Sequence, residues 1–360
     1  DKALTEVLPV CDPQDLLIDA IFGSGLTRPA SGLYADIIEY INRQSSRVLA
    51  IDVPSGLFCD HPVPSGSKQF VVKADFTLSF APPKLSFFFP ENAQFAGEWI
   101  VNEIGLHTEY LENAKVRNFF TEPEDIAGML RVRKRFEHKG DYGHALLIGG
   151  STGKMGAVSL AAKACIRSGP GLVTAAIPTS GINTLQSYAP EVMISPGNSH
   201  DFVDQLPDLS SYRAIGVGPG LGTRPESAAL LKLLIQQTPV PIVFDADAIN
   251  ILAENKTWLG FLPSGSIFTP HPKEFERLAG KSGNSFERNT LQREFSVRFG
   301  CFVVLKGAYT AITTPEGDCW FNPTGNPGMA TGGSGDVLTG IITGLMAQGY
   351  TPFHAALSGV

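Results

Sequence analysis

The feature that most constrains this chain of 360 residues is a repeated pattern, in which a short apolar run stops at a glycine-rich or polar cluster. Beyond residue 140 such runs lie at 145–148, 214–217, 242–244, 267–269 and 302–305. Runs of this length and composition predict buried strands of a parallel sheet. Because the carboxyl ends of parallel strands meet at one edge, we expect these clusters to line a single cleft. A helix of small residues at 157–168 is expected to pack closely on that sheet.

The same pattern begins the chain. Strands are predicted at 16–22, 48–53 and 76–80, with a helix at 35–43. Asp19 and Asp52 fall near strand ends, where a buried carboxylate without a partner would be costly. These carboxylates can cap neighbouring loops, or they can hold a cation together with backbone carbonyl groups around Ser55. Lys84, which follows the third run, is either a partner charge or a surface lysine.

A glycine-rich stretch at 326–344, NPGMATGGSGDVLTGIITG, is predicted to be a turn that opens a helix. Converging backbone N–H groups and the positive end of the helix dipole suit a phosphate there. Asp336 is unexpected in that turn, because a carboxylate repels the anion that the turn attracts. It is therefore either a helix N-cap or the group that takes a proton from a substrate.

Four polar residues at predicted strand ends have two interpretations each. His271, between two prolines, can contact a ligand or hydrogen-bond to the backbone. Lys306 ends an apolar run, so a phosphate would be its natural counter-charge, although its stem can also extend to solvent. Asp245 and Asp247 can bind magnesium or cap the following helix.

Composition and charge argue against a nucleic-acid-binding protein, a membrane-spanning protein and a disulfide-bonded protein. A net charge of −7 argues against an extended nucleic-acid surface, so the basic run at 131–139 is interpreted as a solvated connector. No apolar run of about eighteen residues occurs, so no membrane-spanning helix is expected. Five scattered cysteines predict free thiols and a cytoplasmic protein. The chain starts at Asp1 and ends at Val360 in a strand-like segment, so both ends look cut. The sequence therefore does not exclude a targeting segment upstream of Asp1.

The first third resembles the epimerase half of the bacterial bifunctional NAD(P)H-hydrate repair enzymes, through DAIFGSGL (19–26), AIDVPSG (50–56) and ADFTLSFAPPK (74–84). The resemblance implies that Asp52 is the acid/base at the carbon that changes hand, and that Asp19 and Ser55 help hold potassium. It also implies that Asp52 and a glycine turn contact the substrate; the turn consists of Gly23, Ser24, Gly25, Leu26, Thr27, Arg28 and Pro29. The family's Asn-Asn-Gly-Gly-Asp loop is absent, so we expect an incomplete epimerase site.

The remainder resembles the ADP-dependent dehydratase half of the same family, which has a ribokinase-like fold. The matching stretches, in order, are KGDYGH (139–144), GGSTGKMGA (149–157), GPGLG (218–222), TPHPKEF (269–275), LKGAYT (305–310) and NPGMATGGSGDVLTG (326–340). The implied substrate contacts are Ala157, Gly220, His271 and Asp336, with Asp336 as the catalytic base. The implied nucleotide contacts are Lys306, Gly307, Ala308, Tyr309, Thr310 and Gly335.

We therefore predict an α/β protein of two domains. A Rossmann-like three-layer α/β/α epimerase domain is expected at 1–113, and a ribokinase-like α/β dehydratase domain at 114–360. Relative to the family, the chain looks truncated at both ends.

The resemblance implies metabolite repair. The first domain would interconvert the R and S epimers of NAD(P)H hydrate, and the second would dehydrate the S epimer with ADP, which gives NAD(P)H, AMP and phosphate. The implied cofactors are Mg²⁺ and K⁺. The expected partners are small molecules and further copies of the chain, with neither nucleic acid nor membrane.

The sequence leaves two alternative functions, both less favoured. A ribokinase-like kinase for a vitamin precursor would use the same glycine turn and aspartate, but the fused first domain and the Pro-His-Pro sequence disfavour it. A non-catalytic nucleotide-binding scaffold is disfavoured because Asp52, Asp336, Lys306 and His271 are all present.

Overall fold

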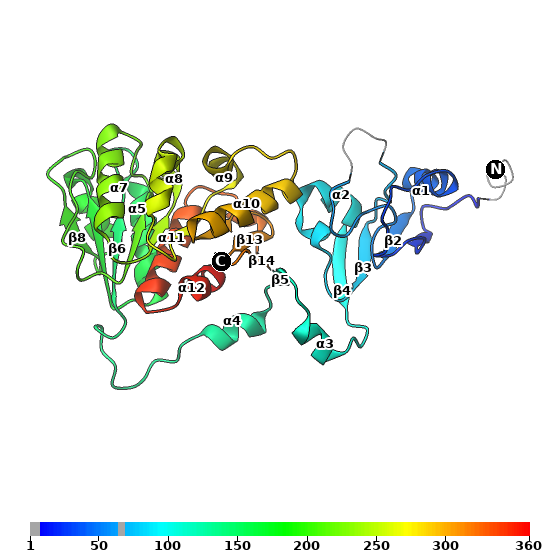
Figure 1. The fold of residues 1–360 in the computed structure, drawn as a ribbon, viewed down its shortest axis with the longest axis horizontal. Coiled ribbons are helices and arrows are strands. Elements are labelled where there is room, and N and C mark those ends of the chain that lie inside the picture. The colour runs from blue at the N-terminus through cyan, green and yellow to red at the C-terminus, as the bar shows by residue number, and fades with distance from the viewer. Residues whose placement is uncertain (1–7, 64–68) are drawn as a thin grey trace. The chain divides into compact units, whose positions relative to one another are not determined.

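The computed structural model describes residues 8–63 and 69–360, which form two compact units (Figure 1). The first unit comprises residues 1–116 and 283–288, and the second comprises 117–282 and 289–360. Each unit has its own sheet, with four strands in the first and ten in the second among the residues described. The assignment of one activity to each domain stays a prediction.

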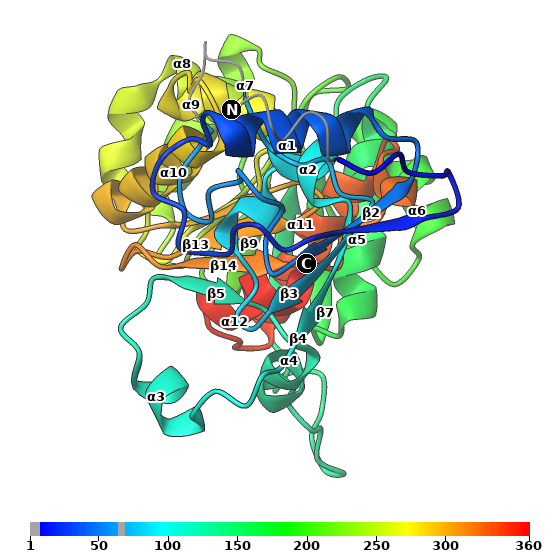
Figure 2. The same ribbon diagram turned by 90° about the vertical axis from the view of Figure 1, so that its right-hand side faces the viewer.

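The sheet of the first unit is parallel, with the strand order β1-β2-β3-β4. Its strands are β1 (Leu16–Asp19), β2 (Arg47–Ile51), β3 (Phe76–Phe80) and β4 (Glu98–Asn102). The helices are α1 (Leu33–Arg43), α2 (Ala93–Ala96) and α3 (Thr108–Asn113), with 3-10 turns η1 (Leu85–Phe88) and η2 (Pro90–Asn92). Figure 2 shows α1 running above the strands of this sheet. The three expected strands and the helix are present, whereas β4 was missed because its side chains alternate between partly buried and exposed.

The sheet of the second unit has the order β5-β14-β13-β12-β11-β10-β9-β6-β7-β8. Its strands are β5 (Asn118–Phe120), β6 (His144–Ile148), β7 (Leu172–Ile177), β8 (Met193–Pro196), β9 (Ala214–Val217), β10 (Ile242–Phe244), β11 (Ile267–Phe268), β12 (Phe302–Leu305), β13 (Thr310–Thr313) and β14 (Cys319–Asn322). All pairs from β12 to β8 along this order are parallel, and β13 is antiparallel to both of its neighbours. The five strands predicted from the apolar runs therefore end at one edge, as expected.

Helices of the second unit carry the rest of its core. They are α4 (Pro123–Met129), α5 (Met155–Ser168), α6 (Ile182–Tyr188), α7 (Pro225–Gln237), α8 (Ala246–Glu254), α9 (Pro272–Ala279), α11 (Ser334–Ala347) and α12 (Pro352–Gly359). The 3-10 turns are η3 (Thr179–Gly181), η4 (Lys256–Phe261) and η5 (Pro327–Met329). Helix α10 (Ser285–Phe299) has its first residues in the first unit and the remainder in the second. None of the helices described is both long and apolar enough to cross a membrane.

Helices α5 and α11 lie side by side and approach closely (Figures 1 and 2). A Cβ atom at Gly340 of α11 would lie 2.1 Å from the carbonyl oxygen of Ala161 in α5. A Cβ atom at Gly344 would lie 2.1 Å from Oγ of Ser168. The small residues expected to bring α5 close to the sheet therefore also bring it close to α11, whose first turn belongs to the candidate site.

The prediction of a strand-like segment at the end of the chain is wrong. Residues 352–359 form helix α12, which begins after Thr351. The Thr351 Oγ1 atom accepts a hydrogen bond from the backbone N–H of His354 at 3.2 Å, and Pro352 occupies the first helical position. A threonine N-cap followed by proline is a helix start that outweighs the apolar character of the segment.

The basic run at 131–139 is exposed, yet two of its arginines are bound to the surface of the second unit. Arg131 donates to the carbonyl oxygens of Gln348 at 3.2 Å and Gly349 at 2.7 Å, and its guanidinium carbon lies 5.0 Å from the centre of the Tyr350 ring. Arg133 donates to the carbonyl oxygen of Gly169. The run is a connector, as predicted, but it is held in place by its own charges.

Candidate active sites

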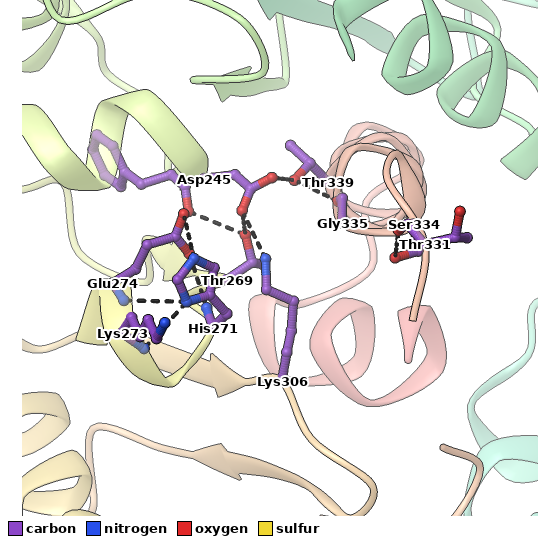
Figure 3. Close-up of polar contacts among 11 residues, drawn as sticks. Asp245, Thr269, His271, Lys273, Glu274, Lys306, Thr331, Ser334, Gly335 and Thr339 are labelled. Carbon is purple, nitrogen blue, oxygen red and sulfur yellow. Dashed lines mark hydrogen bonds and ion pairs between the residues drawn. The ribbon is translucent and has the colours of Figure 1, made fainter. Parts of the chain in front are cut away.

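Asp245, directly after β10, joins four elements of the second unit at the edge where the strands end. Asp245 is 1% exposed. Its Oδ1 atom accepts hydrogen bonds from Thr269 Oγ1 at 2.9 Å and from Lys306 Nζ at 3.2 Å (Figure 3). Its Oδ2 atom accepts one from Thr339 Oγ1 at 2.7 Å. Thr269 directly follows β11, Lys306 directly follows β12, and Thr339 lies in α11. Asp245 occupies the N-cap position of α8, but its side chain makes no capping bond. The capping role predicted for this side chain is therefore wrong, whereas its role as a metal ligand stays a prediction.

The ammonium group of Lys306 lies beside the first turn of α11. A Cβ atom at Gly335 would be 3.1 Å from Lys306 Nζ. The protein itself supplies a counter-charge for Lys306, in Asp245, where the sequence suggested a phosphate or an extension of the side chain to solvent. The side chain is still 25% exposed, so the ammonium is also within reach of an anion at the helix start.

Asp336 lies in the first turn of α11 and is half-buried. Its carboxylate makes no hydrogen bond or ion pair with any residue that the structure describes. Burial and, next, the charge of Asp245 raise its pKa to about 6, while Lys306 acts in the opposite direction. Gly333 is the N-cap of α11, so the N-cap interpretation of Asp336 is wrong. What remains is an unpartnered carboxylate poised to exchange a proton near neutral pH.

His271 is the N-cap of α9, and its ring is fixed by backbone contacts. Its Nδ1 atom accepts hydrogen bonds from the N–H groups of Lys273 at 3.1 Å and Glu274 at 3.3 Å, and the Glu274 Oε2 atom accepts one from the N–H of His271 at 2.8 Å (Figure 3). The backbone-bonded interpretation is therefore correct. Because Nδ1 accepts, the neutral ring carries its proton on Nε2, 3.5 Å from Oε1 of Glu274. The side chain is 45% exposed, which leaves the contact to a ligand as a prediction.

Gly220 and Ala157, predicted to contact the substrate, lie next to each other. Gly220 has a φ of 64°, and a Cβ atom there would lie 3.3 Å from Cβ of Ala157 and 2.5 Å from the carbonyl oxygen of Lys154. Asp247 holds this region together: its Oδ2 atom accepts a hydrogen bond from the N–H of Gly222 at 2.8 Å and lies 3.3 Å from Lys154 Nζ. Only a residue without a side chain fits at position 220.

The predicted nucleotide residues at 306–310 form the turn between β12 and β13. The N–H of Gly307 donates to Thr310 Oγ1 at 3.4 Å, and Thr310 Oγ1 donates to the carbonyl oxygen of Gly307 at 3.2 Å. A Cβ atom at Gly325 would lie 2.2 Å from the carbonyl oxygen of Ala308, so the chain entering the glycine-rich stretch passes directly over this turn. Tyr309 lies half-buried between Ala308 and Thr310.

In the first unit, Asp52 pairs with Lys84. Its Oδ1 atom lies 3.0 Å from Lys84 Nζ, and its Oδ2 atom accepts a hydrogen bond from the N–H of Ser24 at 3.1 Å. A Cβ atom at Gly23 would lie 3.3 Å from Oδ2, so the glycine turn rests against this carboxylate. Lys84 is thus a partner charge, and it also donates to the carbonyl oxygen of Phe80 at 2.7 Å. The turn continues through Gly25 and Leu26 to Thr27, Arg28 and Pro29, which are exposed.

Asp19 and Ser55, the predicted potassium ligands, are bonded to each other. Ser55 donates from Oγ to Oδ1 of Asp19 at 2.6 Å and from its N–H to Oδ2 at 2.7 Å. Asp19 is 1% exposed, so these bonds satisfy a carboxylate that would otherwise be buried without a partner. Carboxylate and hydroxyl oxygens suit a hard cation in kind, but a cation here would need further oxygen ligands.

No magnesium site is assembled from side chains. In residues 8–63 and 69–360, no group of three or more His, Cys, Asp or Glu side chains could hold a metal ion. Asp245 and Asp247, the candidates from the sequence, are engaged with Lys306 and Lys154. The residues present fit Mg²⁺ only as an ion that arrives with nucleotide phosphates, which commonly supply most of its ligands together with water.

Comparison with known families gives matches over both units. Residues 145–360 match the NAD(P)H-hydrate dehydratase family, and residues 1–86 match the family described as YjeF-related protein N-terminus. The bifunctional NAD(P)H-hydrate repair enzyme of Moorella thermoacetica is 38% identical over 96% of this chain and 66% of its own length. The enzyme of the same name from Coxiella burnetii is 36% identical over 98% of this chain and 72% of its own length. The chain thus spans about two thirds of the length of these relatives.

Solved structures give the same assignment for the second unit. The ADP/ATP-dependent NAD(P)H-hydrate dehydratase from Bacillus subtilis, co-crystallised with ATP/Mg²⁺, is 32% identical with a TM-score of 0.59, over 68% of this chain and 87% of that one. A ribokinase-like superfamily protein from Enterococcus faecalis is 27% identical with a TM-score of 0.58, over 69% of this chain and 86% of that one. The predicted ribokinase-like fold is confirmed. The chain belongs to the family of bifunctional NAD(P)H-hydrate repair enzymes.

Proposed function

We propose that the second unit dehydrates the S epimer of NADH or NADPH hydrate with ADP as phosphoryl donor. The observation that carries this proposal is Asp336, an unpartnered, half-buried carboxylate with a raised pKa in the first turn of α11. It stands where a glycine-rich turn and the Lys306 ammonium can receive a phosphate. A base and a phosphoryl site in contact are what activation of a ring hydroxyl requires.

The reaction starts with Asp336 as general base. Its carboxylate takes the proton of the ring hydroxyl while that oxygen forms a bond to the β-phosphorus of ADP, and the bond from this phosphorus to the bridging oxygen breaks to release AMP. Lys306 and the N–H groups at 333–335 offset the negative charge on the phosphoryl group in transit. Mg²⁺, when bound to the nucleotide phosphates, supplies further positive charge there.

The second step needs little from the protein. The lone pair of the ring nitrogen expels phosphate from the neighbouring carbon, and loss of a proton from the adjacent ring carbon restores the dihydronicotinamide double bond. Gly220, Ala157 and His271 would hold the ring during these steps, with Nε2 of His271 as a hydrogen-bond donor. The balance is one hydrate and one ADP consumed, with one NAD(P)H, one AMP, one phosphate and one proton released.

A coupled assay tests this function. The protein is incubated with ADP, Mg²⁺ and NADH hydrate, and we expect the near-ultraviolet absorbance of the dihydronicotinamide ring to recover while AMP accumulates. ATP in place of ADP tests the choice of donor. Failure to restore NADH, together with formation of a stable phosphate ester from ATP and a vitamin-precursor alcohol, would instead establish a small-molecule kinase.

For the first unit we infer an epimerase of the same hydrates, with Asp52 as the acid/base. Its carboxylate is held between the Lys84 ammonium and the glycine turn that we assign to substrate binding. Potassium bound near Asp19 and Ser55 belongs to this proposal. Exchange of the R and S hydrates, followed by chromatography in K⁺ and in Na⁺ buffers, tests both points: an unchanged exchange rate in Asp52→Ala would reassign the acid/base, and equal rates in the two salts would remove potassium.

The location and assembly of the protein are also inferred. A cytoplasmic protein agrees with the five free cysteines, three of them buried. A homo-oligomer is the expected assembly. Light scattering on the purified protein measures its mass and would reject this assembly if only single chains were found.

A further inference from the structure

Two carboxylates in the second-unit site lie near one ammonium group. The positive charge of Lys306 acts on both carboxylates. It forms an ion pair with Asp245, and it opposes the rise in the pKa of Asp336. The ion pair is made with Asp245 alone, at 3.2 Å. Asp336 is left without a partner among the residues described. Of the two carboxylates, Asp245 is therefore the one that pairs with Lys306.

The reason lies in how Asp245 is held. Its two oxygens receive three hydrogen bonds, and the hydroxyls of Thr269 and Thr339 provide two of them. Each hydroxyl fixes one oxygen, so the carboxylate cannot turn away from Lys306. Thr339 is also three residues beyond Asp336 in α11, on the same face of that helix. Asp245 is thereby anchored to the element that carries the proposed base.

We propose that Asp245 is a positioning residue of this site: it holds the Lys306 ammonium at the end of β12 and prevents it from pairing with Asp336. This proposal rests on the proposed dehydratase function. An ion pair with Lys306 would keep Asp336 occupied and make it a weaker base. With Lys306 held by Asp245, the carboxylate stays free for the substrate hydroxyl, and the ammonium stays beside Gly335 for the phosphate.

The charges around Asp336 agree with this arrangement. After burial, the groups that act on its pKa are Asp245, Lys306, Asp247 and Glu274, and Lys306 alone among them is positive. Asp247 is bonded to Lys154 and to the N–H of Gly222, and Glu274 to the N–H of His271. Lys306 is thus the cation whose position decides how strong a base Asp336 is.

The decisive experiment follows the titration of Asp336 directly. Side-chain carboxyl carbons are labelled with ¹³C, the Asp336 signal is assigned by its loss in Asp336→Asn, and its midpoint is measured in wild type and in Asp245→Asn. We expect the midpoint to fall by about one pH unit or more in Asp245→Asn, because a negative charge is lost and Lys306 becomes free to pair with Asp336. The acid limb of kcat/KM should move in the same direction.

Asp247→Asn is the matched control, because it removes one negative charge two residues away and leaves Lys306 bound. Its shift should be less than half of that in Asp245→Asn. A shift in Asp245→Asn that is absent, or no larger than in Asp247→Asn, would overturn the proposal. So would a double-mutant cycle in which Asp245→Asn has the same effect with Lys306 present and in a Lys306→Met background.

A second variant covers the case in which Asp245→Asn does not fold. If Lys306 is held by Asp245, Lys306→Met should raise the Asp336 midpoint by less than about one pH unit, whereas loss of a direct partner raises a carboxyl pKa by about 1–3 units. A rise in that higher range would contradict the proposal. The titration needs no turnover, so this result is separate from the assay of the proposed function, which fails only if wild-type protein does not dehydrate the hydrate.

Discussion

Asp336 combines partial burial with the absence of a partner, and both should lower the stability of the fold. Its pKa of about 6 lies above the ordinary value of 3.8, so the folded protein binds this proton more tightly than the unfolded chain. The free energy of unfolding therefore decreases as pH rises from about 4 to about 6, and the loss persists at neutral pH.

Replacement of Asp336 by Asn removes this penalty. At about pH 7 we expect the free energy of unfolding to rise by about 1–2 kcal/mol, a figure reduced from the full pKa difference because the side chain is partly exposed. At about pH 4 the variant and wild type should be equally stable. Urea denaturation at both pH values measures this, and an equal gain at the two values would show that ionisation is not the cause.

The same substitution should abolish dehydration and leave the nucleotide site intact. Asn cannot accept the hydroxyl proton, so we expect kcat for dehydration to fall by at least about 10²-fold. The affinity for ADP, measured by calorimetry, should change by less than about threefold, since the proposed nucleotide contacts do not include this carboxylate. Full turnover in the variant would remove Asp336 from the mechanism.

At the scale of residues, the sequence indicated which side chains belong to the site but not how they are connected. Asp336, Lys306 and His271 were singled out from local patterns, and the structure places Lys306 beside the turn that holds Asp336. The role of Asp245 could not be predicted, because an aspartate after a strand is equally compatible with a metal site and a helix cap. Its hydroxyl partners lie 24 and 94 positions further along the chain, beyond the reach of any local pattern.

At the scale of elements, the contact between α5 and α11 depends on Gly340. An alanine there has a better helix propensity by about 1 kcal/mol, but its Cβ would lie 2.1 Å from the Ala161 carbonyl oxygen. We expect Gly340→Ala to lower the free energy of unfolding by about 1–3 kcal/mol, because α11 must move away from α5.

Gly128 provides the control, since it lies in α4 and a Cβ atom there would meet nothing within 4 Å. Gly128→Ala should leave the protein as stable as wild type or stabilise it by up to about 1 kcal/mol. Denaturant melts of the two variants test the pair. If Gly340→Ala behaved like Gly128→Ala, close helix packing would not be limiting at this position.

Elements with a continuous apolar run were predicted almost to the residue, and strands with an alternating or mixed run were not. The runs at 214–217, 242–244 and 302–305 coincide with β9, β10 and β12, which are buried on both faces. Strand β4 and the hairpin of β13 and β14 were missed, because a short alternating or mixed run does not distinguish a strand from a loop. For the last helix, the apolar composition favours a strand, whereas the N-cap Thr351 and the proline after it start a helix.

At the scale of the whole molecule, the two candidate sites lie in separate compact units. We expect Asp52→Ala to reduce exchange between the hydrate epimers by at least about 10²-fold while dehydration of purified S hydrate continues at the wild-type rate. Asp336→Asn should show the converse. Chromatography of R hydrate, S hydrate and NADH in one reaction measures both rates, and loss of both activities in either variant would indicate that the sites depend on each other.

The tie between Arg131 and the turn at 348–349 has a consequence for proteolysis. Trypsin can cut after Arg131 only when its guanidinium has left the carbonyl oxygens of Gln348 and Gly349, whereas the equally exposed side chains of Lys134 and Arg135 are not held by such bonds to the residues that the structure describes. Brief digestion should therefore cut first after Lys134 or Arg135. The rate of later cutting after Arg131 would measure how often Arg131 detaches from the turn that ends α11. It would therefore measure local opening at the end of this helix that is opposite to Asp336.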